Sequence, residues 1–299
     1  MKVGYVAVMG RPNVGKSTLV NALLKFKLAA VSPKPQTTRY KILGIINEPD
    51  AQILILDTPG IFKKSMYALH DYMLKEAKES MRDADVVLWV VEPVMPTDLE
   101  EGIAEELKTV AKKKNTPVIL VINKIDTVHK NALLPIMDTY SKLYDFAAYV
   151  PISALKGDGL DILLEEIKKH LPEGEPFYPT DEITDKPLRF IVAEIIREKI
   201  FLYYRQEIPY STAVKVEEFR EPKGENDPIY IRATIYVEKD SQKGILIGKG
   251  GQALKKVGTH ARKELEALLG RKVYLELWVK VKKNWRENLG FIRELELGL

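Results

Sequence analysis

The sequence predicts an open α/β sheet in its first half and a smaller α+β domain in its second half. The chain has 299 residues, more than one hydrophobic core usually organises, so we expect two domains. Because 45% of the residues are hydrophobic and 29% are charged, disordered and collagen-like chains are excluded. The order of apolar segments and one proline-rich stretch then predict what each half forms.

Short apolar runs alternate with helix-period segments in the first half. Strands with few polar residues are buried on both faces, which is typical of parallel sheets. Such runs occupy residues 3–8, 53–56, 86–91 and 118–122. Helical spacing is found between them and after them, at residues 66–81, 97–113 and 160–170. The alternation predicts βαβ units with helices on both faces of the sheet.

Residues 171–180 contain three prolines and one glycine and can continue neither a helix nor a strand. We therefore place the first domain at 1–175, a linker at 176–186, the second domain at 187–285 and a tail at 286–299. In the second domain we expect a helix at 187–204 and two strands of alternating residues at 211–219 and 229–237. A helix pair around residues 248–251 and a last strand at 273–281 follow. Gly290 and Gly298 weaken the helical pattern of the tail.

Charge is concentrated in one segment. Residues 239–286 hold 13 basic and 4 acidic residues, although the whole chain carries a net charge of only +4. This excess favours a polyanionic partner, while a solvated Lys/Arg face remains the alternative. The absence of cysteine excludes a thiolate zinc site and fits a reducing compartment. With no apolar run of about 20 residues and no signal-peptide pattern, we expect a cytoplasmic protein.

A glycine-rich phosphate motif follows the first predicted strand. Gly10-Arg-Pro-Asn-Val-Gly-Lys-Ser17 matches GxxxxGK[ST], in which backbone N–H groups surround phosphates, the lysine reaches the β and γ phosphates and the serine ligates Mg²⁺. A glycine-rich turn without a ligand is the alternative, but the placement between a strand and a helix disfavours it. We expect nucleotide contacts from Gly10, Asn13, Val14, Gly15, Lys16, Ser17 and Thr18.

Three further motifs follow later strands. Asp57-Thr-Pro-Gly60 places a carboxylate where Mg²⁺ is held and an N–H, that of Gly60, near the γ phosphate. Asn123-Lys-Ile-Asp126 favours guanine, because Asp126 would accept hydrogen bonds from the base and would be left unpaired by adenine. The stem of Lys124 can lie along the base. A backbone N–H from Ser153, Ala154 or Leu155 can reach the guanine O6.

Together these motifs resemble those of translation-factor-class GTPases, in the branch that contains Era, Der and MnmE. The resemblance implies that Pro35-Gln-Thr-Thr-Arg39 is the first switch segment, so that Thr38 joins Ser17 and Asp57 as a Mg²⁺ ligand in the GTP state. Catalytic roles then fall to Lys16, Thr38, Gly60 and Asn13. Ile61 stands where Ras-like enzymes have a water-orienting glutamine. Since Asn13 occupies the position that helps hold K⁺ in this branch, we hypothesise slow, K⁺-accelerated hydrolysis.

The second domain contains a loop typical of RNA-binding proteins. Gly248-Lys-Gly-Gly251 lies between two helical segments and follows Ile245 and Ile247, as in the GxxG loop that holds nucleic-acid phosphates beside an apolar groove. A plain helix–turn–helix glycine pair is the alternative. The segment resembles a type II KH domain. We expect RNA contacts from Ile247, Gly248, Lys249, Gly250, Gly251, Lys255 and Lys256, and an apolar groove for unstacked bases formed by Ile245, Ile247 and Leu254.

A P-loop GTPase domain followed by a KH domain resembles the Era family over essentially the whole chain. That resemblance implies a GTP-hydrolysing switch that binds the single-stranded 3′ end of small-subunit ribosomal RNA and acts in assembly of the small ribosomal subunit. It also implies loose association with the inner face of the cell membrane, for which the sequence shows no anchor. We expect a monomer. Two alternatives stay open at this point: a constitutive RNA-binding protein that barely turns over GTP, and an ATPase with an RNA-binding appendage.

Overall fold

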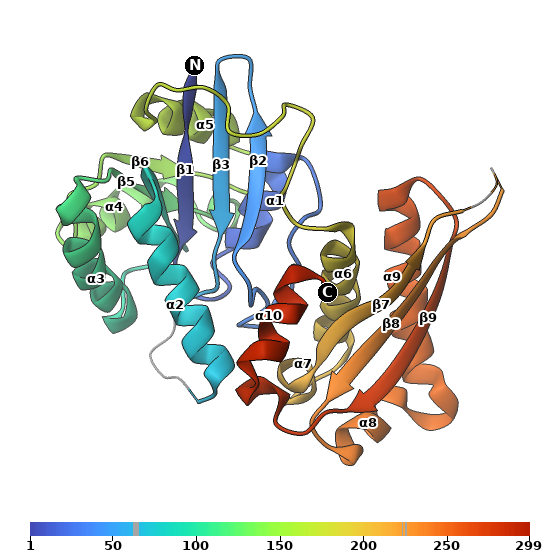
Figure 1. Ribbon diagram of the computed structural model, residues 1–299. Coiled ribbons are helices and arrows are strands. Elements are labelled where there is room, and N and C mark those ends of the chain that lie inside the picture. The colour runs from blue at the N-terminus through green and yellow to red at the C-terminus, as the bar shows by residue number, and fades with distance from the viewer. Residues whose placement is uncertain (62–65, 223, 225) are drawn as a thin grey trace. The chain divides into compact units, whose positions relative to one another are not determined.

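The chain divides into two units, each built around its own sheet. The computed structural model describes residues 1–61, 66–222, 224 and 226–299, and the side chains of these residues except 110–114. The first unit comprises Met1–Ala29, Thr38–Ser65 and Asp71–Asp185, and the second comprises Ala30–Thr37, Met66–His70 and Lys186–Leu299. Figure 1 shows the elements of both.

A six-stranded sheet with the order β2-β3-β1-β4-β5-β6 forms the centre of the first unit. All neighbours are parallel except β2, which pairs antiparallel with β3. The parallel part is the sheet that the apolar runs predict, whereas β2 is not among the expected strands. The strands are β1 (Lys2–Met9), β2 (Ile42–Asn47), β3 (Ala51–Asp57), β4 (Val86–Val91), β5 (Val118–Ile122) and β6 (Ala148–Pro151).

Helices cover both faces of this sheet (Figure 1). Leu19 of α1 and Leu163 of α5 belong to one core, while Leu107 of α3 and Ile136 of α4 belong to the other. Successive residues of each strand point to opposite faces, which is why β4 and β5 are apolar throughout. The helices are α1 (Lys16–Leu24), α2 (Ala68–Asp83), α3 (Asp98–Lys114), α4 (Leu133–Ser141) and α5 (Leu160–His170).

The parallel register places the functional loops at one edge of the sheet. Val8 pairs with Asp57, and Met9 pairs with Trp89, so β1, β3 and β4 end side by side. Val121 and Ile122 pair with Val150 and Pro151, which adds the ends of β5 and β6. In open α/β sheets ligands bind at this carboxyl edge.

The proline-rich stretch expected as a linker packs on the first unit. The buried amide of Gln52 accepts a hydrogen bond from the backbone N–H of Phe177 (2.7 Å) and donates one to the carbonyl of Tyr178 (2.8 Å). Further along, the carbonyl of Ile183 accepts a bond from the N–H of Ile45 in β2 (2.7 Å). The chain up to Asp185 is therefore held by backbone and amide hydrogen bonds.

The second unit is α+β, as expected. Its sheet has the order β7-β8-β9, with β7 antiparallel and β9 parallel to β8. Alternate residues of β8 such as Ile231, Ala233 and Ile235 are fully buried. The elements are α6 (Leu188–Tyr203), α7 (Ile208–Ser211), β7 (Ala213–Arg220), β8 (Ile229–Val237), α8 (Asp240–Ile247), α9 (Gln252–Leu269), β9 (Val273–Val281) and α10 (Leu289–Leu297).

The tail forms a regular helix, α10, in spite of its glycines. The Asn288 side chain caps the helix by accepting a bond from the N–H of Phe291 (2.9 Å), and Gly298 ends it with a φ of 69°. A left-handed residue at this position is a common helix terminator, so Gly298 stops the helix rather than weakening it. Phe291, Ile292 and Leu295 are buried, which makes α10 part of the second unit's core.

We predict that Ile292→Ala lowers the free energy of unfolding of the second unit by about 2–5 kcal/mol, because the substitution removes a fully buried side chain from α10. Leu297→Ala, in the same helix but 55% exposed, is the matched control and should change stability little. Differential scanning calorimetry of the full chain measures both. Equal transition temperatures for the two variants would show that α10 does not contribute to the core.

Candidate functional site

The loop between β1 and α1 approaches its neighbours so closely that two positions require glycine. A Cβ on Gly10 would lie 2.2 Å from the carbonyl oxygen of Val90, and one on Gly15 would lie 2.2 Å from Nδ2 of Asn123. Both residues also have positive φ, 146° and 97°, where other side chains are strained. The phosphate motif therefore lies directly against the end of β4 and against the motif that follows β5.

Lys16 is buried inside this loop. Its Nζ donates to the carbonyl oxygens of Arg11 (2.7 Å) and Gly10 (3.2 Å). Burial lowers the pKa of Lys16 to about 8, although the nearby carboxylate of Asp57 acts in the opposite direction. The free protein thus holds a desolvated cation beside the loop N–H groups, which favours an anionic ligand.

Three oxygen-bearing side chains from distant parts of the sequence meet at the start of α1. Ser17 Oγ lies 2.7 Å from Thr38 Oγ1 and 2.7 Å from Asp57 Oδ2. Asp57 ends β3 and is fully buried. Hydroxyl and carboxylate oxygens are the ligands that Mg²⁺ prefers. These oxygen donors make the trio the candidate metal site. The described residues contain no cluster of three or more His, Asp or Glu side chains that could hold a metal.

The segment after β3 also lies against the phosphate loop. A Cβ on Gly60 would be 2.8 Å from the backbone nitrogen of Pro12, and the N–H of Ile61 donates to the carbonyl of Gly10 (3.2 Å). The side chain of Ile61 is buried in the core shared by α2, α3 and α4. It can neither donate nor accept a hydrogen bond, so it cannot orient an attacking water.

The motif after β5 links the phosphate loop to the loop after β6. Asn123 donates through Nδ2 to the carbonyl of Val14 (2.9 Å) and accepts through Oδ1 from the N–H of Ala154 (3.0 Å). Asp126 Oδ1 accepts a bond from Ser153 Oγ (2.6 Å). The structure thus brings together the residues expected to select the base, with Leu155 beside them and 76% exposed.

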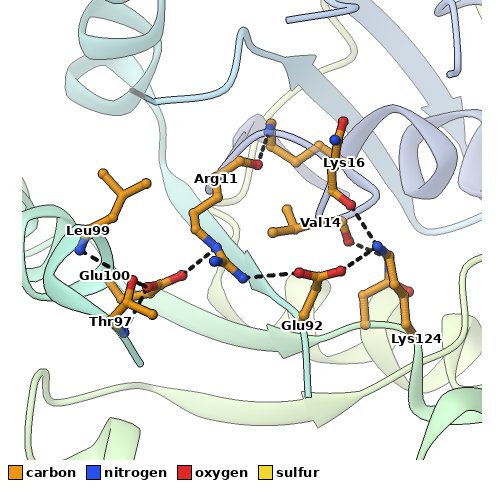
Figure 2. Close-up of polar contacts among 10 residues, drawn as sticks. Arg11, Val14, Lys16, Glu92, Thr97, Leu99, Glu100 and Lys124 are labelled. Carbon is orange, nitrogen blue, oxygen red and sulfur yellow. Dashed lines mark hydrogen bonds and ion pairs between the residues drawn. The ribbon is translucent and has the colours of Figure 1, made fainter. Parts of the chain in front are cut away.

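Two charged residues at this edge were not identified from the sequence. Figure 2 shows Glu92, directly after β4, between the side chains of Arg11 and Lys124, and Glu100 on the far side of Arg11. A single acidic residue after a strand matches no motif, so only the three-dimensional arrangement reveals it.

The GxxG loop of the second unit requires glycine at its first position. Gly248 has a φ of 72°, and a Cβ there would lie 2.6 Å from Cβ of Ala253. Gly250 and Gly251 also have positive φ, 58° and 76°, in the short 3₁₀ turn (Lys249–Gly251) before α9. Lys249 is exposed at the tip. Backbone and cation are therefore accessible, as phosphate binding requires.

A groove of about 350 Å³ runs from this loop along α9 and β9. Of the apolar residues expected in it, Leu254 lines it, whereas Ile245 and Ile247 belong to α8, and Ile245 is 53% exposed. Sequence reasoning missed the contribution of β9, because only folding places that strand beside α9. The lining residues are Gly251, Leu254, Lys255, Gly258, Thr259, Arg262, Leu275 and Leu277.

Comparisons with known proteins agree with this architecture. A family described as "50S ribosome-binding GTPase" matches residues 5–124, and a KH domain family matches residues 207–286. The GTPase Era of Lactobacillus helveticus is 51% identical over 294 residues, which are 98% of this chain and 95% of that protein. Every helix in the described part of the chain is too short or too polar to cross a membrane.

Two solved structures superpose over the full length of both chains. A variant of Aquifex aeolicus Era bound to GDP·AlF4⁻ has a TM-score of 0.93 and 46% identity. Era in complex with MgGDPNP and nucleotides 1506–1542 of 16S ribosomal RNA has a TM-score of 0.90 and 47% identity. These comparisons confirm the P-loop GTPase and KH fold classes expected from the sequence. The chain belongs to the Era family of GTPases.

Proposed function

We propose that this GTPase binds Mg·GTP at the carboxyl edge of its six-stranded sheet, hydrolyses it slowly, and uses the nucleotide state to control RNA binding by the second unit. One observation carries the proposal: the hydroxyl of Ser17 lies 2.7 Å from the hydroxyl of Thr38 and 2.7 Å from the carboxylate of Asp57. Thr38 lies in the segment that the family resemblance assigns to the first switch. The loss of the γ phosphate would then directly change the contacts of that segment.

The donor set of this trio fits Mg²⁺. Ser17 and Thr38 supply hydroxyl oxygens and Asp57 supplies a buried carboxylate, all hard ligands. Mg²⁺, when bound, neutralises charge on the β and γ phosphates. The chain's own residues do the rest: Lys16 contacts the same phosphates, and the N–H of Gly60 contacts the γ phosphate, with the further nucleotide contacts supplied by residues 10–18.

The base is guanine in this proposal. Asp126 accepts hydrogen bonds from N1–H and the exocyclic amine of guanine, while adenine would leave the carboxylate unpaired. The bond from Ser153 Oγ (2.6 Å) fixes that carboxylate. Lys124 covers the base with its stem, and the loop 153–155 supplies an N–H to O6.

Hydrolysis is slow in this proposal because Ile61 stands where Ras-like enzymes have a water-orienting glutamine. The apolar, buried Ile61 leaves positioning of water to the loop backbone and phosphates. Asn13, with its left-handed φ of 67°, is placed on the phosphate loop where the family resemblance predicts help in holding K⁺. K⁺-accelerated hydrolysis stays a prediction.

The RNA ligand is the single-stranded 3′ end of small-subunit ribosomal RNA. A relative 47% identical over the whole chain was solved with nucleotides 1506–1542 of 16S ribosomal RNA. The groove beside Gly248–Gly251 offers the required features: apolar walls from Leu254, Leu275 and Leu277, and cations from Lys255 and Arg262. Lys249 is exposed at the tip of the loop, whereas the ammonium group of Lys256 lies over the ring of Tyr203, 4.4 Å from its centroid. The description of the matching GTPase family names the 50S subunit, but that match covers only residues 5–124 of the first unit. Because the RNA ligand belongs to the small subunit, we propose a role in small-subunit assembly.

Our remaining expectations concern the environment of the protein. A cytoplasmic location, a monomeric state and peripheral association with the cell membrane stay predictions.

We predict that GDP binding takes up protons near pH 8. Burial lowers the pKa of Lys16 to about 8 in the free protein, so half of the molecules lack this charge at pH 8, whereas bound phosphates favour the ammonium form. Binding should therefore take up about half a proton at pH 8 and much less at pH 6.5. Calorimetry in two buffers with different ionisation enthalpies measures this uptake. A heat of binding that is the same in both buffers at pH 8 would contradict the prediction.

We predict that a single-stranded RNA oligonucleotide of the 3′ end raises multiple-turnover GTP hydrolysis, and that Gly248→Asp with Lys249→Asp abolishes most of this response. The substitutions place negative charge in the loop expected to hold RNA phosphates. Gly224→Asp with Lys272→Asp changes the net charge equally, at exposed positions outside the groove lining, and serves as control. Phosphate release is the readout.

RNA that binds without changing turnover would contradict the switch and leave two independent binding modules. Turnover too slow to measure in K⁺ buffer, with RNA binding intact, would favour the constitutive RNA-binding protein.

A further inference from the structure

Glu92 bridges the two cations that frame the nucleotide site. Its Oε2 lies 3.0 Å from Nη2 of Arg11 in the phosphate loop, and its Oε1 lies 2.5 Å from Nζ of Lys124 in the base motif (Figure 2). Glu92 directly follows β4, at the carboxyl edge of the sheet. One carboxylate therefore connects the phosphate-binding and base-binding halves of the site.

The same contacts close a ring on the phosphate loop. Besides its ion pair with Glu92, Nζ of Lys124 donates to the backbone carbonyl of Asn13 (2.7 Å). Asn13 has a φ of 67°, a left-handed conformation that asparagine adopts more readily than most residues with a side chain. The ring leaves the loop at the side chain of Arg11 and returns at the carbonyl of Asn13, so it holds the loop at two points that are two residues apart.

Arg11 has a second anchor that Lys124 lacks. Its Nε lies 2.6 Å from Oε1 of Glu100, whose side chain is only 2% exposed. The other oxygen of Glu100 accepts hydrogen bonds from the N–H (2.9 Å) and the hydroxyl of Thr97 and so caps the first turn of α3. If Glu92 lost its charge, Arg11 would keep its ion pair with Glu100, whereas Lys124 would keep, among the described residues, only the hydrogen bond to the Asn13 carbonyl. The position of Lys124 therefore depends more strongly on Glu92.

We propose that Glu92 is a positioning residue for guanine nucleotides. It draws the ammonium group of Lys124 to the end of β4, so that the aliphatic stem lies along the base, and it couples that position to the phosphate loop. This inference rests on the proposed nucleotide site. It assigns a role to a residue that belongs to none of the sequence motifs.

The proposal predicts a particular pattern of affinities. The side chains of Arg11, Glu92 and Lys124 are 23–36% exposed, so solvent weakens their ion pairs and the loss of GDP affinity should be moderate. We expect Glu92→Gln to weaken GDP binding about 5- to 10-fold through faster dissociation. The stem of Lys124 contacts the base plane and not its edge, so IDP should weaken by the same factor as GDP. The KM for GTP should rise with it while kcat changes less than about twofold, because ground state and transition state lose the same contact.

Stopped-flow dissociation of mant-GDP and mant-IDP from the full chain tests the proposal. Glu105→Gln removes a carboxylate that is 72% exposed on α3 and pairs with Lys108, and it is the matched control. Lys124→Met keeps the stem and removes the charge. If Glu92 acts through Lys124, Glu92→Gln should add less than about twofold in the Lys124→Met background.

Three results would overturn the proposal. Dissociation from Glu92→Gln as slow as from Glu105→Gln would show that the bridge has no role in binding. A full effect of Glu92→Gln that persists in the Lys124→Met background would show that Glu92 acts elsewhere, for example on stability alone. Equal mant-GDP binding by the wild type and Lys16→Met would place the nucleotide outside this loop, which is a failure of the proposed site itself and is recognised by that variant.

Discussion

The nucleotide site depends on the close approach of one glycine-rich backbone to three other segments. Gly10 touches the end of β4, Gly15 touches Asn123, and Gly60 touches Pro12, each at a distance that leaves no room for a Cβ atom. Two of these contacts are with backbone atoms, and the third is with the side-chain amide of Asn123, which is itself hydrogen-bonded to Val14 and Ala154. A shift of the loop would therefore disturb the ends of β3, β4 and β5 together. The phosphate, metal and base regions therefore form a single structure.

Polar side chains then complete what the backbone contacts begin. Asn123 bonds both the phosphate loop and the loop after β6, Ser17 joins Thr38 to Asp57, and Glu92 joins the loop to Lys124. Each bridge connects segments that are distant in sequence. This explains how a change at the phosphates can reach the segment of Thr38, which is the physical basis of the proposed switch.

The motifs and the parallel sheet could be predicted from the sequence because both follow local rules. Buried parallel strands are continuous apolar runs, and the motifs stand directly after them, so the register alone brings Ser17, Asp57 and Asn123 to one edge. β2 was not predicted, although it forms a local hairpin with β3 across residues 48–50. Gly44 interrupts its apolar run and lowers the β propensity of the segment. The groove on the second unit was predicted only at Leu254, since Leu275 and Leu277 come from β9 and reach α9 only after folding. Glu92 could not be identified from the sequence, because its role depends on Arg11 and Lys124, which only folding brings into contact with it.

Our central claim is that Thr38 reports the γ phosphate through the oxygen trio at the start of α1. The most direct test compares the affinities of the Thr38→Ala variant for mant-GDP and mant-GDPNP in Mg²⁺ with those of the wild type. We expect GDP affinity to stay within about twofold and affinity for the triphosphate analogue to fall about tenfold, because the hydroxyl is a ligand only in the triphosphate state. Equal losses for both nucleotides, or no loss for either, would contradict the account.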